Sequence, residues 1–323
     1  MENANGTTLK EFVLLGFGLD PSKQYIILIF FVLLYVLTLV ENVTIITVVL
    51  LDAQLSQLPM YILLSNFSWM EICYVTTTVP RMLFDLTSSH GIISLQACLT
   101  QFYVLFSLGT TEFFFLSAMA LDRYLAICHP LHYTQIMTPN SCYALVAACW
   151  FLGFLGYIVP VTLISTLSFC GPNIIDHFLC DPGPILSLAC PPVGNIPLLC
   201  QIVINTLFLA NVVFVVISYG IVIFTLMKSS NQGSRKKAFS TISMHLLVVT
   251  LFYGSVGGMY LIPSGENQSE FTKAITLFYT TITPFVNPLI YCLRNGQVKE
   301  ALRRIIRRIF VKATVEKRHR SER

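Results

Sequence analysis

The chain has 323 residues and a formal net charge of +4. Hydrophobic residues make up 55% of it, charged residues only 11%, and the mean hydropathy is +0.72. Soluble domains carry about 25% charged residues, because their surface has to be solvated. This composition excludes a soluble enzyme and a disordered chain, and it leaves a polytopic membrane protein.

Seven stretches of the sequence are long and apolar enough to cross a bilayer as a helix, which takes roughly 20 mostly apolar residues. They are much longer than the roughly 10-residue strands of a membrane barrel, and they lack the alternation of such strands. We therefore expect an all-α membrane protein, a seven-transmembrane helix bundle, with helices over 25–50, 59–86, 98–128, 141–166, 198–227, 238–262 and 273–293. The predicted domains are an N-terminal segment 1–24, a transmembrane domain 25–293 and a C-terminal segment 294–323.

The distribution of Lys and Arg predicts the orientation, because these residues concentrate in cytoplasmic segments. The loop 167–197 contains none, whereas the tail from Arg294 onward holds eleven, and the loop after the fifth stretch holds Lys228, Arg235, Lys236 and Lys237. The loop near Asp52 also contains none and does not bear on the orientation. We expect a cytoplasmic C-terminus and, with an odd number of spans, an extracellular N-terminus. The positive charge faces an anionic leaflet and gives no indication of nucleic-acid binding.

Two further features bear on the extracellular side. Asn5 begins an Asn-Gly-Thr sequon, so we expect it to carry an N-linked glycan. Cys170, Cys180 and Cys190 lie in the long outer loop, and Cys98 opens the third stretch on the same side. Disulfides are expected in that oxidising compartment, but four cysteines allow three pairings and their spacing does not choose among them.

Three strings carry a family resemblance. The third stretch ends in Met119–Tyr133, which reads Met-Ala-x-Asp-Arg-Tyr-x-Ala-Ile-Cys-x-Pro-Leu-x-Tyr. The sixth opens with Lys237–Leu246, and the seventh closes with Pro284–Asn295, which contains Asn-Pro-x-x-Tyr. Together they resemble the odorant receptors, a branch of the rhodopsin-like G-protein-coupled receptors, and the long cysteine-rich loop resembles that of the tetrapod-type (class II) members.

The chain also departs from the usual pattern of that family. Glu41 stands where Gly is usual, Glu71 stands where Asp is usual, and Ile242 and Met244 replace Cys and Ser. None of these changes removes a group on which the family's signalling depends. They bear on the level of basal activity.

The resemblance implies a function as well as a fold. It implies disulfides Cys98–Cys180 and Cys170–Cys190, a small volatile odorant as ligand, and a plasma-membrane location. The implied partner is the stimulatory heterotrimeric G protein of olfactory neurons, which raises cyclic AMP, with no enzymatic activity and no cofactor. A rhodopsin-like receptor for a lipid or peptide is the alternative within receptors. A small transporter is the alternative from another class, but it would show inverted repeats, which are not evident.

Arg123 is the main candidate for a signalling residue. Alone, it could be an interfacial arginine that reaches toward the headgroups. Asp122 offers it a local charge partner, and a paired charge that can be released makes a two-state latch. With the resemblance, we expect coupling to the G protein and the activation switch to involve Asp122, Arg123, Tyr124, Tyr219, Lys237, Asn287, Pro288 and Tyr291.

Ionisable residues inside the predicted spans form a second candidate set, because such groups are costly unless partners or water satisfy them. Glu71, Glu112 and His245 are of this kind, and Asn42 and Asn287 lie at related positions. They form either a structural hydrogen-bond network or a polar pocket that binds a cation or water and rearranges on activation. A transition metal is a minority interpretation, since no short ligand spacing supports it.

The outer half of the third stretch carries the candidate ligand face. Phe102, Leu105, Phe106, Gly109 and Thr110 fall at i, i+3, i+4, i+7 and i+8, so they share one side of a helix. Such stripes are usually packing, but the resemblance places a ligand here in a small, mostly apolar cavity. No Asp or Glu belongs to this set, so we do not expect an amine held by an ion pair. The facing residues are predicted to be Val203, Leu207, Tyr253, Val256, Gly257, Tyr260 and Thr280.

After Asn295, apolar residues recur at helical spacing and basic residues fill the other face. This pattern predicts an interfacial amphipathic helix in the cytoplasmic segment, and a calmodulin target is the less favoured interpretation. The apolar face consists of Val298, Ala301, Leu302, Ile305, Ile306, Ile309 and Phe310.

Overall fold

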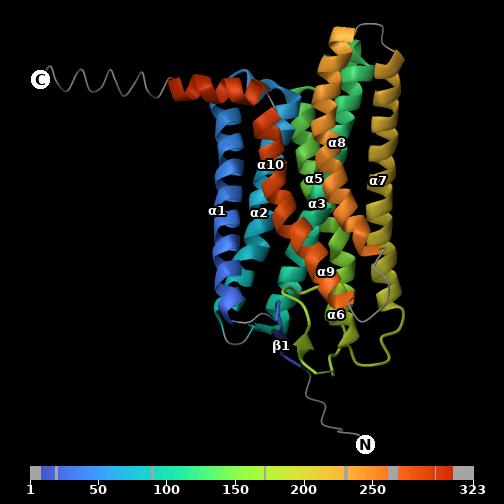
Figure 1. The fold of residues 1–323 in the computed structure, drawn as a ribbon. Helices are drawn as coiled ribbons and strands as arrows, with labels where there is room; N and C mark the ends of the chain where they lie inside the picture. The colour runs from blue at the N-terminus through green and yellow to red at the C-terminus, as the bar shows by residue number, and fades with distance from the viewer. Residues whose placement is uncertain are drawn as a thin grey trace, which may run out of the picture.

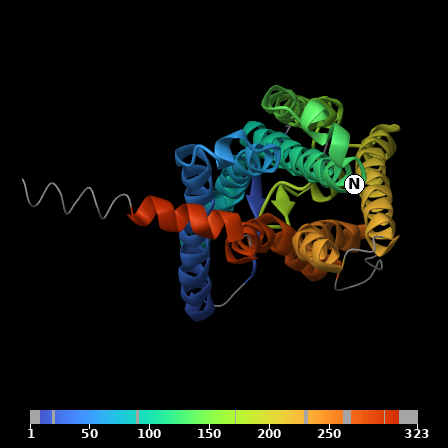
Figure 2. The ribbon, with the colours of Figure 1, turned by 90° about the horizontal axis from the view of Figure 1, so that it is seen from above.

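A computed structural model of the chain describes residues 9–18, 21–88, 91–170, 172–228, 232–260, 268–294 and 296–307. It is a bundle of long helices that run side by side (Figures 1 and 2). The long helices are α1 (Pro21–Leu51), α2 (Pro59–Thr87), α3 (Leu95–Cys128), α5 (Pro139–Ser165), α7 (Ile196–Lys228) and α8 (Gln232–Tyr260). Asn5 and its predicted glycan lie outside the described residues.

The seventh predicted span is not one regular helix. It consists of α9 (Gln268–Leu277), a π-helical turn η2 (Phe278–Ile282) and α10 (Thr283–Arg294). Pro288 lies inside α10, where it cannot donate a backbone hydrogen bond. Single π turns inside helices are often found at functional sites.

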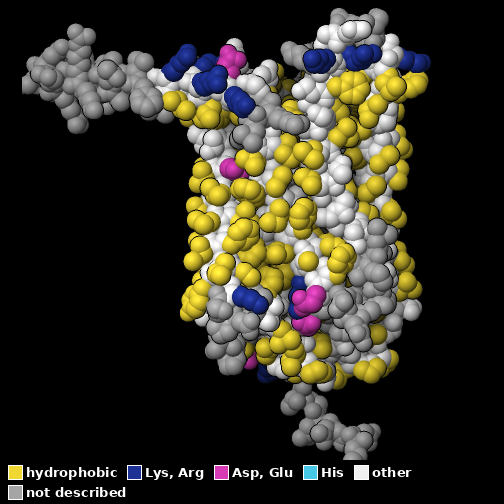
Figure 3. Space-filling model, in the orientation of Figure 1, with side chains coloured by type: hydrophobic (Ala, Val, Ile, Leu, Met, Phe, Trp, Pro, Cys, Tyr) yellow, Lys and Arg dark blue, Asp and Glu magenta, His cyan; other side chains and the backbone are white. Residues whose placement is uncertain are grey.

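Five of the described helices have the length and apolar composition needed to cross a membrane. They are α1 from Lys23, α3, α5, α7 and the Ala238–Met259 part of α8. Many large apolar side chains on their outer faces are exposed, including Ile26, Val216 and Phe224. Figure 3 shows these apolar side chains over the flank of the bundle, with Lys and Arg gathered toward one end. The folded bundle therefore exposes the apolar surface that a multi-pass membrane protein presents to lipid.

The starts of the helices follow local sequence signals. Pro59 and Pro139 begin α2 and α5, where a missing N–H costs nothing because the first turn of a helix has no acceptor for it. Ser94 accepts a hydrogen bond from the backbone N–H of Ala97, and Thr138 accepts one from that of Ser141. These side chains cap α3 and α5.

Helix α3 is central, since it packs against α2, α5, α7 and α8. It packs closely against α5 at Gly153, where an added Cβ would collide with the side chain and backbone of Thr111. Helix α1 lies at the side of the bundle, against α2 and α10. The cavity described below opens between α3 and its neighbours on the side away from α1.

A small sheet closes the end of the bundle near the N-terminus, and the sequence did not predict it. Strand β1 (Glu11–Leu14) pairs antiparallel with β2 (Gly91–Ser94) and parallel with β3 (Ile174–Ile175). Two disulfides hold the loop that carries β3 and the short helix α6 (Pro182–Ser187). They join Cys98 to Cys180, with 5.5 Å between Cα atoms, and Cys170 to Cys190, with 5.1 Å.

The opposite end carries three short elements: η1 (Leu55–Gln57), α4 (Pro130–Ile136) and a helix over 296–307. The last of these lies across the end of the bundle (Figure 1). Val298 and Ala301 are buried on its inner face, and Leu302 and Ile305 pack against the core. Ile309 and Phe310 of the predicted apolar face lie outside the described residues.

Candidate functional site

A cavity of about 600 Å³ lies in the half of the bundle that is closed by the disulfide-linked loop. Its walls come from α2, α3, α5, α7, α8 and the π turn η2, and the loop around α6 closes it. Aromatic and aliphatic side chains form most of the lining, and the aromatic ones include Phe106, Phe113, Tyr157, Phe208 and Phe252. Cavities of this size and composition are typical of sites for small organic ligands.

Half of the predicted ligand residues line this cavity. Helix α3 contributes four of them, and α7 and α8 contribute one each. A Cβ added at Gly109 would lie 3.5 Å from the Tyr74 hydroxyl oxygen, so a methyl group fits there and a larger side chain would project into occupied or ligand space. The six are Leu105, Phe106, Gly109, Thr110, Leu207 and Val256.

Five of the other six residues do not line the cavity. Phe102 is fully buried beside Phe106 and Tyr157, with ring centroids 5.2 and 6.0 Å away, and Thr280 is buried and donates to the carbonyl of Thr276. Tyr253 stacks on Phe113 with 5.4 Å between ring centroids and donates to its carbonyl, behind the wall. Helical spacing defines a face but not how neighbouring helices are rotated against it. Val203 and Gly257 are also absent from the lining, and the side chain of Tyr260 is outside the described part.

Asp181 lines the cavity, which corrects the expectation that no acidic residue does so. It directly follows Cys180, whose disulfide to Cys98 ties the loop to the start of α3. This tether brings Asp181, Pro182 and Gly183 over the cavity. The predicted Cys98–Cys180 disulfide could have indicated this position for Asp181, since it fixes the loop to the outer end of α3, beside a site built on that helix.

Asp181 is only 7% exposed, and its Oδ1 accepts a hydrogen bond of 3.0 Å from the backbone N–H of Gly183. Burial raises the pKa of this carboxyl to about 6, and the Gly183 hydrogen bond opposes that shift. Asn205 lies on another wall, and its Oδ1 is buried without a hydrogen-bond partner among the described residues. The cavity therefore holds two hydrogen-bond acceptors that the chain does not fully satisfy.

The predicted latch lies at the other end of α3. Arg123 donates to Asp122 through Nε, at 2.9 Å, and through Nη2. Tyr133 of α4 donates to the second oxygen of Asp122 at 2.8 Å, so this buried carboxylate is satisfied on both sides. Tyr124 contacts the Nε2 of His129 at 3.0 Å, on the outside of the pair.

The remaining predicted switch residues do not all meet at Arg123. The Tyr219 hydroxyl is buried without a hydrogen-bond partner in the described part of the chain. Tyr291 lies 3.4 Å from the Nδ1 of His245 instead. Asn287 belongs to the polar cluster described next, and the side chain of Lys237 lies outside the described residues.

The predicted polar network is divided into separate parts. Asn287 donates to Glu71 at 2.6 Å, which joins α10 to α2. His245 pairs with Tyr291, and Asn42 donates to the carbonyl of Thr38 in its own helix. Both carboxyl oxygens of Glu112 are buried and lack a hydrogen-bond partner in the described structure, as does one oxygen of Glu71.

Metal binding was the minority interpretation of these residues. Within the described ranges, no group of three or more His, Cys, Asp or Glu side chains is arranged to hold a metal ion. The unsatisfied oxygens of Glu71 and Glu112 instead call for donors or a single cation.

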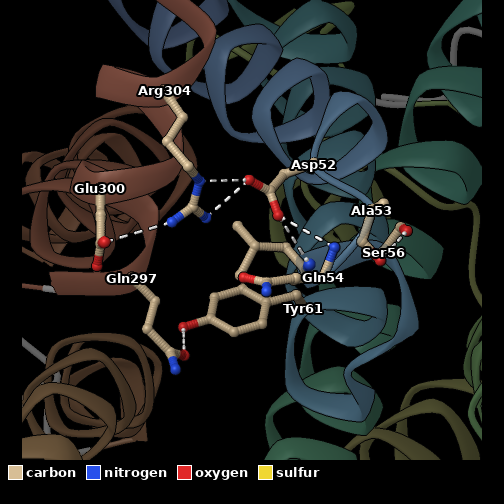
Figure 4. A network of polar contacts seen from close by, with 9 residues as sticks. Asp52, Ala53, Gln54, Ser56, Tyr61, Gln297, Glu300 and Arg304 are labelled. Atoms are coloured by element: carbon tan, nitrogen blue, oxygen red, sulfur yellow. Dashed lines mark hydrogen bonds and ion pairs between the residues drawn. The ribbon is translucent and has the colours of Figure 1, made fainter.

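A contact that the sequence did not predict fixes the helix 296–307 to the loop after α1 (Figure 4). Arg304 donates to the Oδ2 of Asp52 from Nε at 3.1 Å and from Nη2 at 2.7 Å. The other carboxylate oxygen of Asp52 accepts from the backbone N–H groups of Gln54 and Leu55. The Arg304 hydrogen bonds, helped by these backbone donors, hold the pKa of Asp52 below its usual range.

Two more contacts complete this junction. Glu300 lies 3.4 Å from the Nη1 of Arg304 on the same helix, and Tyr61 of α2 donates to the Oε1 of Gln297 at 2.6 Å. Figure 4 shows Arg304 and Gln297 reaching from the helix toward Asp52 and Tyr61, which lie on the same side of it. The amphipathic helix is therefore held by polar contacts as well as by its apolar face.

Comparison with known proteins gives one consistent result. The family model described as "Olfactory receptor" matches residues 31–310. The human protein Olfactory receptor 11H6 is 50% identical over 296 residues, which cover 92% of this chain and 89% of that protein. Human Olfactory receptor 11G2 is 47% identical over 301 residues (93% and 87%), and human Olfactory receptor 11H7 is 47% identical over 308 residues (94% and 97%).

Proposed function

The chain belongs to the olfactory receptor family, whose members are receptors and not enzymes, and we propose that it is an odorant-operated switch in the plasma membrane. A small, mostly apolar odorant binds in the cavity beside α3. Binding biases the bundle toward a state whose opposite end engages a heterotrimeric G protein of the stimulatory olfactory type, which raises cyclic AMP. A ligand can shift this equilibrium only as far as its affinities for the two states differ.

The cavity is the single observation that carries this proposal. It is large enough for a small organic molecule, it is lined mostly by aromatic and aliphatic side chains, and it lies under a loop fixed by a disulfide. Within the predicted set, Leu105, Phe106, Gly109, Thr110, Leu207 and Val256 contact the ligand. Phe102, Val203, Tyr253, Gly257 and Thr280 support the walls, and Tyr260 belongs to the set by prediction alone.

The coupling part of the proposal concerns the far end of α3. Arg123 and Asp122 form an ion pair that Tyr133 supports, and we assign it the role of a latch that opens on activation. Tyr219 is poised to accept the released arginine, since its buried hydroxyl has no partner in the described structure. Tyr124, Lys237, Asn287, Pro288 and Tyr291 are assigned to the same switch by family resemblance.

The proposed topology follows from the charge distribution. The helices α2 and α9–η2–α10 complete a set of seven spans, the N-terminus with a glycan on Asn5 is extracellular, and the C-terminus is cytoplasmic. The basic face of the helix 296–307 then lies against the anionic inner leaflet. The buried residues Glu71, Glu112 and Asn287 lie at mid-membrane, where they bind a cation or water that would satisfy the free oxygens of Glu71 and Glu112, and Asn42 belongs to this set by prediction alone.

A reporter assay tests the proposed function directly. Cells that express the full chain should raise cyclic AMP in response to at least one member of a chemically diverse odorant panel. Gly109→Leu should remove that response, whereas Gly254→Leu is a matched control, since a Cβ at Gly254 meets nothing within 4 Å. Equal responses from the two variants at equal surface expression would contradict the proposed ligand site.

A further inference from the structure

The charge of the ligand cavity is unbalanced. Its lining contains one acidic residue, Asp181, and no Lys, Arg or His among the described residues. Only 7% of the Asp181 surface is exposed, and no ion pair joins its carboxylate to any other described side chain. Two cations of this end of the bundle already have acidic partners: Lys273 is held by Asp176 at 2.5 Å and Glu270 at 3.0 Å, and Arg81 is held by Asp85 at 2.9 Å.

A buried carboxylate without a cation is costly, because burial removes water that stabilised the charge. The backbone N–H of Gly183 satisfies one oxygen of Asp181, which leaves the second oxygen for another donor. Its pKa, raised to about 6 by burial, still leaves the group mostly ionised at neutral pH. A cationic donor inside the cavity would restore the balance that the chain itself does not supply.

A second acceptor lies on a different wall. The Oδ1 of Asn205 on α7 is buried without a described partner, and buried polar atoms of this kind are rarely left unsatisfied. The rest of the lining includes Phe106, Phe113 and Phe208, which offer ring faces to a hydrocarbon or to a cation. The cavity thus combines hydrogen-bond acceptors at its walls with an apolar interior.

We propose that the cavity is selective for small amine odorants, with the ammonium group against Asp181 and the hydrocarbon part among the aromatic rings. Asn205 accepts a hydrogen bond from the same head group or from a second polar group of the ligand. Carboxylic acids are disfavoured, because two anions would share a site with no cation in its described lining. This inference rests on the proposed function, since it names the ligand class of the same cavity.

A matched ligand series tests this assignment on the purified full chain in lipid nanodiscs. Hexyl, cyclohexylmethyl and 2-phenylethyl skeletons each carry an amine, alcohol, aldehyde or carboxylic acid, and binding is measured as thermal stabilisation at neutral pH. Within each skeleton that binds, the amine should have the highest affinity, followed by the alcohol, and the acid the lowest.

Variants then assign the preference to residues. Asp181→Asn keeps a capping side chain at the start of α6, because Asn caps about as well as Asp. It should weaken amine binding by about tenfold or more and leave alcohol binding nearly unchanged, since it removes a charge-assisted hydrogen bond. Asn205→Leu should have a smaller effect on the amines. Glu270→Gln is the control, because it removes an exposed negative charge from the same end without touching the cavity.

Several outcomes would overturn the proposal: an alcohol, aldehyde or acid as the best binder, an unchanged amine affinity in folded Asp181→Asn, or no binding by any amine. If Asp181→Asn does not fold, the ranking of the series and the effect of Asn205→Leu still decide. Cyclic AMP measured in cells separates this inference from the proposed function. Amine binding without signalling would contradict only the proposed function, and signalling by odorants indifferent to Asp181 would contradict only the amine assignment.

Discussion

Asp52 and Asp181 lie near opposite ends of the bundle, and both are almost fully buried, with 6% and 7% of their surface exposed. Asp52 is paired with Arg304, and its pKa is lowered. Asp181 has no cation among its described neighbours, and burial raises its pKa to about 6. The same residue type therefore serves as a structural anchor at one end and leaves an unmatched charge in a cavity at the other.

The difference extends beyond these two residues. At the end that carries Asp52, the acid of the predicted latch is satisfied by Arg123 and Tyr133. In the cavity, the Oδ1 of Asn205 is buried without a described partner, and the lining offers Asp181 no cation among its described residues. A buried carboxylate that has its partners within the chain stabilises the fold as it stands, whereas one that lacks a cation is suited to a ligand that supplies the missing donor.

The largest expected effect comes from removing the tether that places Asp181 over the cavity. Cys98→Ser should abolish surface expression or odorant response, because loss of a disulfide costs about 2–5 kcal/mol in small secreted domains. Cys149→Ser is the control, since Cys149 is a buried free cysteine within α5. Surface labelling and cyclic AMP measure both properties, and a normal response from Cys98→Ser would show that the tether is dispensable.

The next prediction concerns the pH dependence of stability. The pKa of Asp181 is about 6 in the folded chain against 3.8 as its ordinary value, so the folded state binds more protons between these values. Its ionisation therefore destabilises the fold as pH rises from about 4 to about 6, by about 3 kcal/mol in total. Asp181→Asn should remove this loss, so that its thermal stability exceeds that of the wild-type chain near neutral pH more than it does at pH 4.

His177 in the same loop makes the comparison with the variant necessary. Burial, followed by the charge of Lys273, lowers the pKa of His177 to about 4, and Asp176 opposes this shift. The folded state then binds fewer protons than the unfolded state, so acidification through pH 6 destabilises it. The effect of His177 is opposite in sign to that of Asp181. It is present in the wild-type chain and in Asp181→Asn alike, so it cancels when the stability of one is subtracted from that of the other. If the difference in thermal stability between Asp181→Asn and the wild-type chain is the same at pH 4 and pH 7, the unmatched charge at Asp181 is contradicted.

The smallest effect is expected at the paired end. Arg304→Ala should lower stability by about 1 kcal/mol, because a partly exposed ion pair contributes little, although Asp52 then loses its partner. Arg303→Ala is the control on the exposed face of the same helix. The loss should shrink at acidic pH, since a lowered pKa means that Asp52 stabilises the fold above its ordinary pKa and ceases to do so as it protonates. An equal effect of Arg303→Ala on thermal stability would show that the Asp52 contact is not specific.

Most of the helical framework could be predicted from the sequence, because long apolar stretches and terminal Pro, Ser and Thr residues act locally. The predicted stretch 141–166 and helix α5 (Pro139–Ser165) differ by only a few residues. The cysteine pairs could be named only through family resemblance, since spacing allowed three pairings. The sheet of β1, β2 and β3 was missed because its strands are short and because whole helices separate them in the sequence.

The site was predicted less completely than the fold, for reasons that concern geometry. The spacing on α3 identified Leu105, Phe106, Gly109 and Thr110, but Phe102 on the same stripe packs into an aromatic cluster. Asp181 and Asp52 were missed because their partners, or their lack of partners, depend on loop paths that helical periodicity does not describe. The polar residues Glu71, His245 and Asn42 were expected in one network, yet each is bonded to a different partner, Asn287, Tyr291 and the carbonyl of Thr38.

The central claim is that α3 links a ligand cavity at one end to a signalling latch at the other. Gly109 and Arg123 are 14 positions apart on this helix, which is about 21 Å at 1.5 Å per residue. The most direct test measures odorant binding and G-protein nucleotide exchange on purified Gly109→Leu and Arg123→Ala variants with equal folded fractions. Arg123→Ala should bind the odorant without stimulating exchange, and Gly109→Leu should lose binding but keep its basal exchange. Normal exchange by Arg123→Ala, or unchanged binding by Gly109→Leu, would contradict the account.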